Sequence, residues 1–183
     1  MTINDRVFVS SLPSLRDNMN DHKPHQIIML SDCQNNVLDA TRPTADDPNW
    51  IATPSRGSLS LVFLDSENMM NVDCPKANHI ESILLFADKD ADIVVACDGG
   101  VSRSSATAIG LLCSRGMKPL DAVTLAFDRK CNIWSNSLMI RLFDQALTLG
   151  GDLIKAVAIA KGLPRCIDCG LLNGDMQDHT CRW

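Results

Sequence analysis

A run of four apolar residues, Ile93–Ala96, is the feature that most constrains the fold of this chain. It is followed by Cys97, then by Gly99 and Gly100, and then by a helix-forming segment from 104 to 115. A short strand that is apolar on both faces is typical of a buried strand in a parallel sheet. Parallel strands are usually joined through helices that pack on the sheet. The pattern therefore predicts an α/β fold in which this strand is buried.

The rest of the chain supports the same fold class. Further strands are expected at residues 6–10, 26–30 and 59–64. Helices are expected at 14–20, 75–87, 104–115, 120–130, from 135 or 136 to 149, and at 152–161. Residues 32–58 are rich in Asn, Asp, Pro, Thr and Ser, so they are expected to be mostly loop. We expect a mainly parallel central sheet with helices on both faces over residues 1–163, and a short Cys-rich tail over 164–183.

Composition excludes several classes of protein. The chain has 183 residues, of which 45% are hydrophobic, which fits one domain with a proper core. Its longest apolar runs are too short to span a bilayer, and no secretory signal is visible at Met1–Arg6. The net charge of -5 argues against nucleic acid as a general partner. Without a secretory signal, the eight cysteines favour a reducing, cytoplasmic location.

The segment that follows the central strand carries the candidate chemistry. A turn that opens into a helix presents backbone amides and a positive dipole, and so forms a cradle for one phosphate. Cys97 at its base would be held as a thiolate and could attack phosphorus. Arg103 could hold two phosphate oxygens with its planar fork, and Ser104 could donate to the sulfur. The residues expected to surround the phosphate are Asp98, Gly99, Gly100, Val101, Ser102 and Arg103.

At Gly100-Val101-Ser102-Arg103-Ser104 the sequence resembles the dual-specificity branch of the protein tyrosine phosphatase superfamily. The resemblance covers most of residues 5–162. It implies hydrolysis of phosphate monoesters in proteins through a phosphocysteine, with no cofactor for catalysis. One position departs from the family pattern, because Ala96 stands where relatives have a histidine. Three functions therefore stay open: a protein phosphatase, a catalytically weak or dead phosphate-binding module, and a phosphatase for nucleotides, RNA ends or lipids.

The reaction needs a carboxylic acid to protonate the leaving group. The family supplies an Asp about thirty residues before the cysteine, and Asp65 lies 32 positions ahead of Cys97. Asp73, 24 positions ahead, is the alternative, and Glu67 is a third. Asp65 is favoured because it follows a predicted strand and opens a polar loop.

Other residues near the motif are interpreted as structural or as part of its rim. The side chain of Asp98 is expected to face outward, and because residues 98–102 contain no Lys or Arg, polyphosphorylated substrates are disfavoured. His79 is expected to be a packed or helix-face residue. Arg129 and Asn136 match a stretch that the family places near the loop, and Asn136 is expected to cap a helix.

Four residues of the tail suggest a zinc site: Cys166, Cys169, His179 and Cys181. A Cys-x2-Cys pair followed by His and Cys can close a tetrahedral zinc centre. Four protein ligands leave no open position for water, so such a zinc would be structural or would recruit a protein partner. The other interpretation is a tail with incidental cysteines.

Overall fold

The computed structural model describes residues 6–41, 57–129 and 133–162. The candidate zinc ligands of the tail lie outside them. The described part of the chain contains four strands: β1 (Val7–Ser11), β2 (Gln26–Ser31), β3 (Ser58–Val62) and β4 (Ile93–Cys97). Its helices are α1 (Leu15–His22), α2 (Gln34–Thr41), α3 (Ala77–Phe86), α4 (Arg103–Ser114), α5 (Pro119–Arg129), α6 (Ser137–Ala146) and α7 (Asp152–Gly162).

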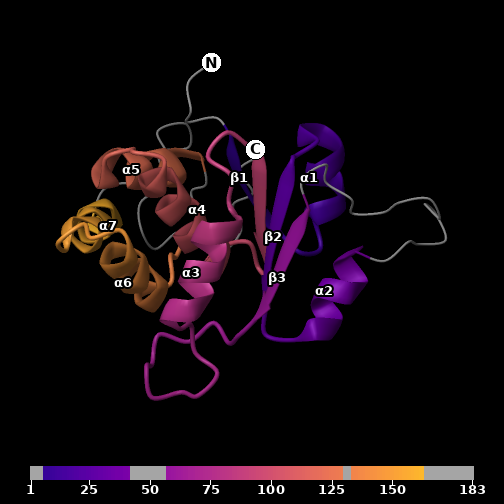
Figure 1. The fold of residues 1–183 in the computed structure, drawn as a ribbon, viewed down its shortest axis with the longest axis horizontal. Helices are drawn as coiled ribbons and strands as arrows, with labels where there is room; N and C mark the ends of the chain where they lie inside the picture. The colour runs from indigo at the N-terminus through magenta and orange to yellow at the C-terminus, as the bar shows by residue number, and fades with distance from the viewer. Residues whose placement is uncertain (1–5, 42–56, 130–132, 163–183) are drawn as a thin grey trace.

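The four strands form one parallel sheet in the order β1-β4-β2-β3. Helices cover both faces, with α1 and α2 on one side and α3 to α7 on the other (Figure 1). Side chains alternate along β4, so that Val94 and Ala96 face the smaller hydrophobic cluster while Ile93, Val95 and Cys97 face the larger one. The expected α/β architecture with helices on both faces is confirmed.

One stretch of the segment 32–58 differs from the prediction of a mostly loop structure, because Gln34–Thr41 forms the helix α2. Residues 42–56 lie outside the described ranges. Its residues are weak helix formers as a group, and among its described side chains Val37 is buried in the smaller cluster. Tertiary packing therefore decides this helix, because local propensity is only a weak guide.

The carboxyl ends of the strands meet at one edge of the sheet, which is the lower edge in Figure 1. The pairing register sets Ser11 and Leu30 beside Cys97, and Ser31 beside Val62. The segments that follow these strands therefore converge, as is usual at ligand sites of open parallel sheets. No helix in the described segments is long and apolar enough to cross a membrane.

Candidate active site

Cys97 is the last residue of β4, and the helix α4 begins six residues later. Its sulfur lies 3.1 Å from the hydroxyl oxygen of Ser104, in the first turn of α4, and both residues are buried. The first N–H groups of a helix have no partners within the helix, and the helix dipole is positive at this end. The structure thus brings the Cys97 sulfur and the Ser104 hydroxyl together at the N-terminus of α4.

The turn between Cys97 and α4 depends on one glycine. Gly100 has a φ of +66°, and a Cβ on it would lie 2.6 Å from the backbone nitrogen of Ser11. Only glycine fits this conformation and this close approach to β1. A Cβ on Gly99, in contrast, would meet nothing within 4 Å. Of the two glycines that the sequence pointed to, Gly100 is therefore the one that the turn requires.

Arg103 is buried, with 2% of its surface exposed, and its guanidinium is surrounded by oxygen atoms. Nη1 donates to the carbonyl of Phe63 at 2.7 Å and forms an ion pair with Asp32 at 2.7 Å. Nη2 donates to Oδ2 of Asp98 at 2.6 Å. Nε lies 3.9 Å from Oδ2 of Asp65 and has no hydrogen-bond partner. Three carboxylates thus meet one buried arginine at the base of the site.

Asp98 differs from its predicted orientation. Its side chain does not face outward but accepts four hydrogen bonds, from the Ser31 hydroxyl, the Asp32 N–H, the Asn36 amide and Arg103. The donors that hold the side chain inward are Ser31 at the end of β2, the N–H of Asp32, and Asn36 on α2, which lie far from Asp98 in the sequence. Burial alone would raise the pKa of Asp98, but the four hydrogen bonds outweigh it and lower the pKa.

Asp65 lies beside the same loop. Its Oδ1 accepts hydrogen bonds from the Ser102 hydroxyl at 2.8 Å and from the Asn136 amide at 2.7 Å, and its backbone N–H donates to Asp32 at 3.1 Å. Asn136 also caps α6, because its Oδ1 accepts from the N–H of Met139. The helix cap predicted at Asn136 is confirmed, and the same side chain holds the candidate acid. The structure brings Asp65 to the loop that follows Cys97.

The alternatives to Asp65 make different contacts. The Asp73 carbonyl accepts from Leu64, and its N–H donates to Asn71. Glu67 accepts from the N–H of Ser137 at the start of α6, and this hydrogen bond lowers its pKa. Neither carboxylate has a contact with Arg103 or Cys97 among those that the structure describes.

His79 has a supporting position, as expected. Its Nδ1 accepts from the N–H of Lys76 at the start of α3, and its ring stacks on Phe63 with 4.7 Å between centroids. Burial, with a smaller effect of Lys76, lowers its pKa. The stacked ring thus packs against the residue whose carbonyl accepts from Arg103.

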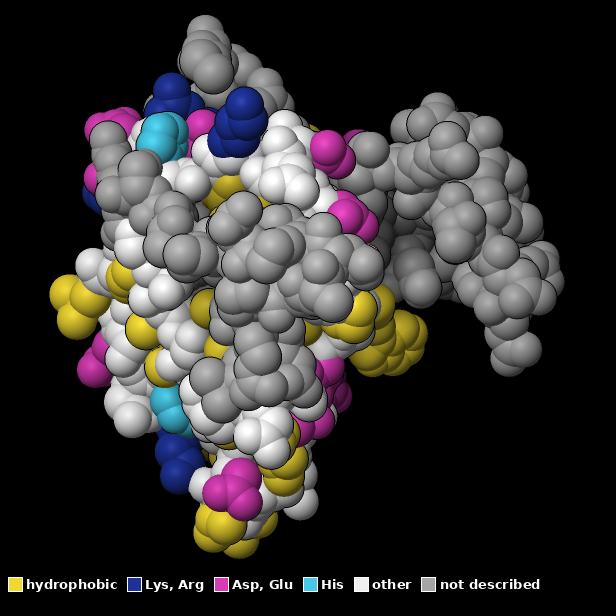
Figure 2. Space-filling view, turned by 90° about the vertical axis from the view of Figure 1, so that its right-hand side faces the viewer, with side chains coloured by type: hydrophobic (Ala, Val, Ile, Leu, Met, Phe, Trp, Pro, Cys, Tyr) yellow, Lys and Arg dark blue, Asp and Glu magenta, His cyan; other side chains and the backbone are white. Residues whose placement is uncertain are grey.

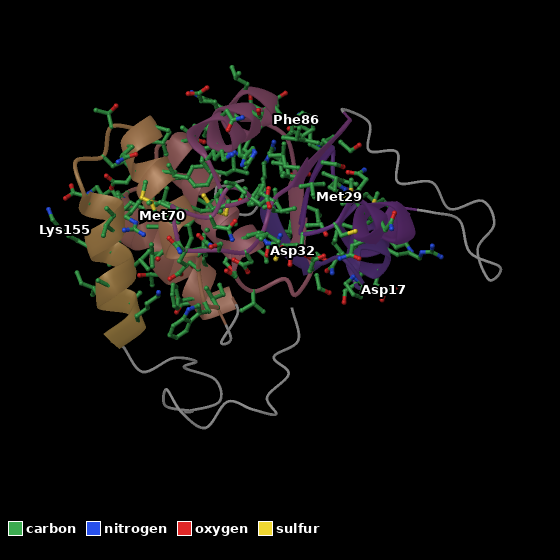
Figure 3. The ribbon with its side chains drawn as sticks, turned by 90° about the horizontal axis from the view of Figure 1, so that it is seen from below. Asp17, Met29, Asp32, Met70, Phe86 and Lys155 are labelled. Carbon is green, nitrogen blue, oxygen red and sulfur yellow. The ribbon has the colours of Figure 1, made fainter. Side chains whose placement is uncertain are left out.

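Asp32 is the functional candidate that sequence reasoning missed. It follows β2 directly and pairs with Arg103 while accepting from the N–H of Asp65. Viewed from below, Asp32 lies at the carboxyl edge of the sheet, between α1 and the helices of the other face (Figure 3). The rule that selected Asp65, a carboxylate directly after a strand, would have selected Asp32 as well.

The surface beside α1 and α2 carries charges of both signs. The described side chains on this side include acidic, basic and hydrophobic groups, and they form no continuous basic surface in this view (Figure 2). Within the described ranges, no three His, Cys, Asp or Glu side chains are grouped so that they could hold a metal ion.

Comparisons with known proteins give a likeness in structure. No protein-family model matches the sequence. No curated protein matches it either. Human DUSP28 superposes with a TM-score of 0.58 at 14% identity, covering 81% of this chain and 97% of that one. The human tyrosine phosphatase-like serine/threonine/tyrosine-interacting protein has the same TM-score at 19% identity, covering 81% and 95%.

A third similar structure is that of PTPMT1 in complex with PI(5)P. Its TM-score is 0.52 at 15% identity, and the match covers 87% of this chain and 97% of that one. At these identities the comparisons concern the fold, and they cover nearly the whole length of each similar chain. The protein described here therefore has the fold of the dual-specificity and tyrosine phosphatases.

Proposed function

We propose that this chain is a cysteine-dependent phosphatase that hydrolyses phosphate monoesters in proteins, at phosphotyrosine, phosphoserine or phosphothreonine. The observation that carries the proposal is the position of the Cys97 sulfur, 3.1 Å from Ser104 at the start of α4, with Arg103 buried in the first turn of the same helix. The fold shared with dual-specificity and tyrosine phosphatases supports it. The cytoplasmic location and the zinc-binding tail stay predictions.

The proposed reaction has two displacements. The Cys97 thiolate attacks phosphorus, and the P–O bond to the leaving group breaks while Asp65 gives that oxygen a proton. Arg103 and the backbone of the loop hold the phosphate oxygens. Asp65 then takes a proton from water as the water oxygen attacks phosphorus. The S–P bond breaks, and Ser104 donates a hydrogen bond to the departing thiolate.

The surroundings of Arg103 favour substrates with a single phosphate. Asp32, Asp65 and Asp98 place three carboxylates against one arginine. Additional phosphates near this cluster would meet negative charge. This supports a singly phosphorylated protein over a polyphosphorylated lipid.

A non-catalytic phosphate-binding module is the second candidate. One observation favours it, because Ala96 stands where relatives have a histidine. One protein of similar structure is itself described as phosphatase-like and interacting.

Turnover of two phosphate esters separates the candidates. The unaltered chain should hydrolyse a small aryl phosphate, Cys97→Ser should abolish this, and Cys33→Ser, at an exposed cysteine, should not. Asp65→Ala should slow hydrolysis of an alkyl phosphate more than that of an aryl phosphate, since a good leaving group needs less protonation. Absence of turnover at every pH between about 5 and 8 would favour the binding module. Equal losses of hydrolysis rate on both esters in Asp65→Ala would count against Asp65 as the acid.

A further inference from the structure

The hydrogen-bond donors of Arg103 divide into two groups. A guanidinium has five N–H groups. Nη1 faces the Phe63 carbonyl and Asp32, and one N–H of Nη2 binds Asp98. The Nε–H is buried without a hydrogen-bond partner, 3.9 Å from Oδ2 of Asp65, and the neighbouring Nη2 carries two N–H groups, of which the described contacts use one. Two adjacent donors are what a bidentate contact with a phosphate needs.

The carboxylate of Asp98 is itself firmly placed. Its two oxygens accept from Ser31, Asp32 and Asn36 at 2.7 to 3.1 Å, in addition to Arg103. These donors belong to β2, to the residue after it and to α2, so Asp98 ties the loop of Cys97 to a neighbouring segment. The lowered pKa of Asp98 agrees with a carboxylate that stays ionised.

Asp32 extends this arrangement to the candidate acid. The same Oδ1 that pairs with Arg103 accepts from the backbone N–H of Asp65. The side chain of Asp32 is 47% exposed, whereas that of Arg103 is 3% exposed, so Asp32 reaches the arginine from the rim. The orientation of the arginine and the position of the acid therefore share one carboxylate.

We propose that Asp98 and Asp32 are positioning residues that orient Arg103 for phosphate. They bind Nη1 and Nη2 and leave Nε–H and the remaining N–H of Nη2 available for the anion. The inference rests on the proposed role of Arg103 as the phosphate clamp. A carboxylate that only competed with phosphate for Arg103 would have the opposite effect on the phosphate Kd. Its removal would then tighten phosphate binding.

Equilibrium binding of inorganic phosphate to the full chain tests the proposal without turnover. Asp98→Asn keeps the shape of the side chain but replaces one acceptor by an N–H2 group and removes the charge. We expect its phosphate Kd to rise about tenfold, which corresponds to the loss of one charge-assisted hydrogen bond. Asp17→Asn, at an exposed position on α1, is the control and should leave the Kd unchanged.

A double-mutant cycle distinguishes positioning from a general effect on the loop. In an Arg103→Ala background, Asp98→Asn should change the Kd by less than about twofold, because the partner through which it acts is gone. An equal fold-change in Kd in both backgrounds would overturn the proposal. An unchanged or lower phosphate Kd in Asp98→Asn would overturn it as well. If Asp98→Asn does not fold, Asp32→Asn gives the same test at a more exposed site, with the same expected direction and the same cycle.

The two proposals can fail separately. The expected changes in phosphate Kd without turnover of any ester would remove the enzyme and keep the positioning role. Turnover that depends on Cys97, together with an unaltered phosphate Kd in Asp98→Asn and Asp32→Asn, would keep the enzyme and remove the positioning role.

Discussion

Asn136 joins the stability of α6 to the placement of the candidate acid, and two substitutions can separate these roles. The residue is fully buried. Its Oδ1 accepts from the N–H of Met139 at 2.9 Å, and its Nδ2 donates to Asp65 at 2.7 Å. Alanine removes both contacts. Serine keeps a hydroxyl that can cap the helix but is too short to replace the contact with Asp65.

The magnitudes follow from these two contacts. Loss of an N-cap costs about 1 kcal/mol, and loss of a hydrogen bond to a charged group costs about 1.5–3 kcal/mol. Asn136→Ala should therefore lower the free energy of unfolding by about 3 kcal/mol, and Asn136→Ser by about 1 kcal/mol less than that. Both variants should lose about tenfold in kcat on an alkyl phosphate, because both leave Asp65 without the amide donor.

Urea unfolding at constant m-value and steady-state kinetics measure the two effects. Equal destabilisation by Ala and Ser would show that capping contributes nothing at this position. Full turnover in Asn136→Ser would refute the role of the amide in holding Asp65, whatever the stability of the variant.

Two other substitutions test the loop and its surroundings. Gly100→Ala should lower the free energy of unfolding by more than about 2 kcal/mol and weaken phosphate binding, since the new Cβ meets the backbone of β1 in a left-handed conformation. Gly99→Ala, which has open space, is the matched control in thermal unfolding and phosphate titration, and an equal effect of both would contradict the argument. Glu67→Gln should lower the unfolding midpoint at pH 7, because the hydrogen bond from Ser137 lowers the pKa of Glu67 from its ordinary value of 4.5 in the folded state. A carboxyl whose pKa is depressed in the folded state stabilises the fold above its unfolded pKa and loses that contribution as the pH falls through the folded pKa. The difference in unfolding midpoint between the unaltered chain and Glu67→Gln should therefore shrink below pH 4.5. A difference that stays constant with pH would contradict this. Glu81→Gln, on the exposed side of α3, is the control for the loss of one surface charge.

The parts of the site that lie within one stretch of chain could be predicted from the sequence. The apolar run before Cys97, Gly100 and the start of α4 at Arg103 are close in sequence, so their residue types determine their geometry. The pattern predicted β3 over 59–64, whereas β3 spans Ser58–Val62 and Phe63 already directs its carbonyl to Arg103. Element ends are set by tertiary contacts that a local pattern does not contain.

The arrangement of carboxylates could not be predicted in the same way. Asp32, Asp65 and Asp98 come from segments that meet only because β3, β2 and β4 are neighbours in the sheet. The inward turn of Asp98 depends on donors from Ser31 and Asn36, and Asn36 lies on a helix that the sequence did not predict. Strand order and side-chain orientation are therefore the information that the sequence reasoning lacked.

The hydrogen bonds of Asp65 have a consequence for the timing of the proposed reaction. The Ser102 hydroxyl, which belongs to the loop of the nucleophile, and the Asn136 amide already hold the carboxylate. The candidate acid is therefore held in place without a substrate, so the proposed reaction needs no separate movement of Asp65 into the site. For such a mechanism we expect that raising the solvent viscosity slows substrate encounter and product release but not bond breaking.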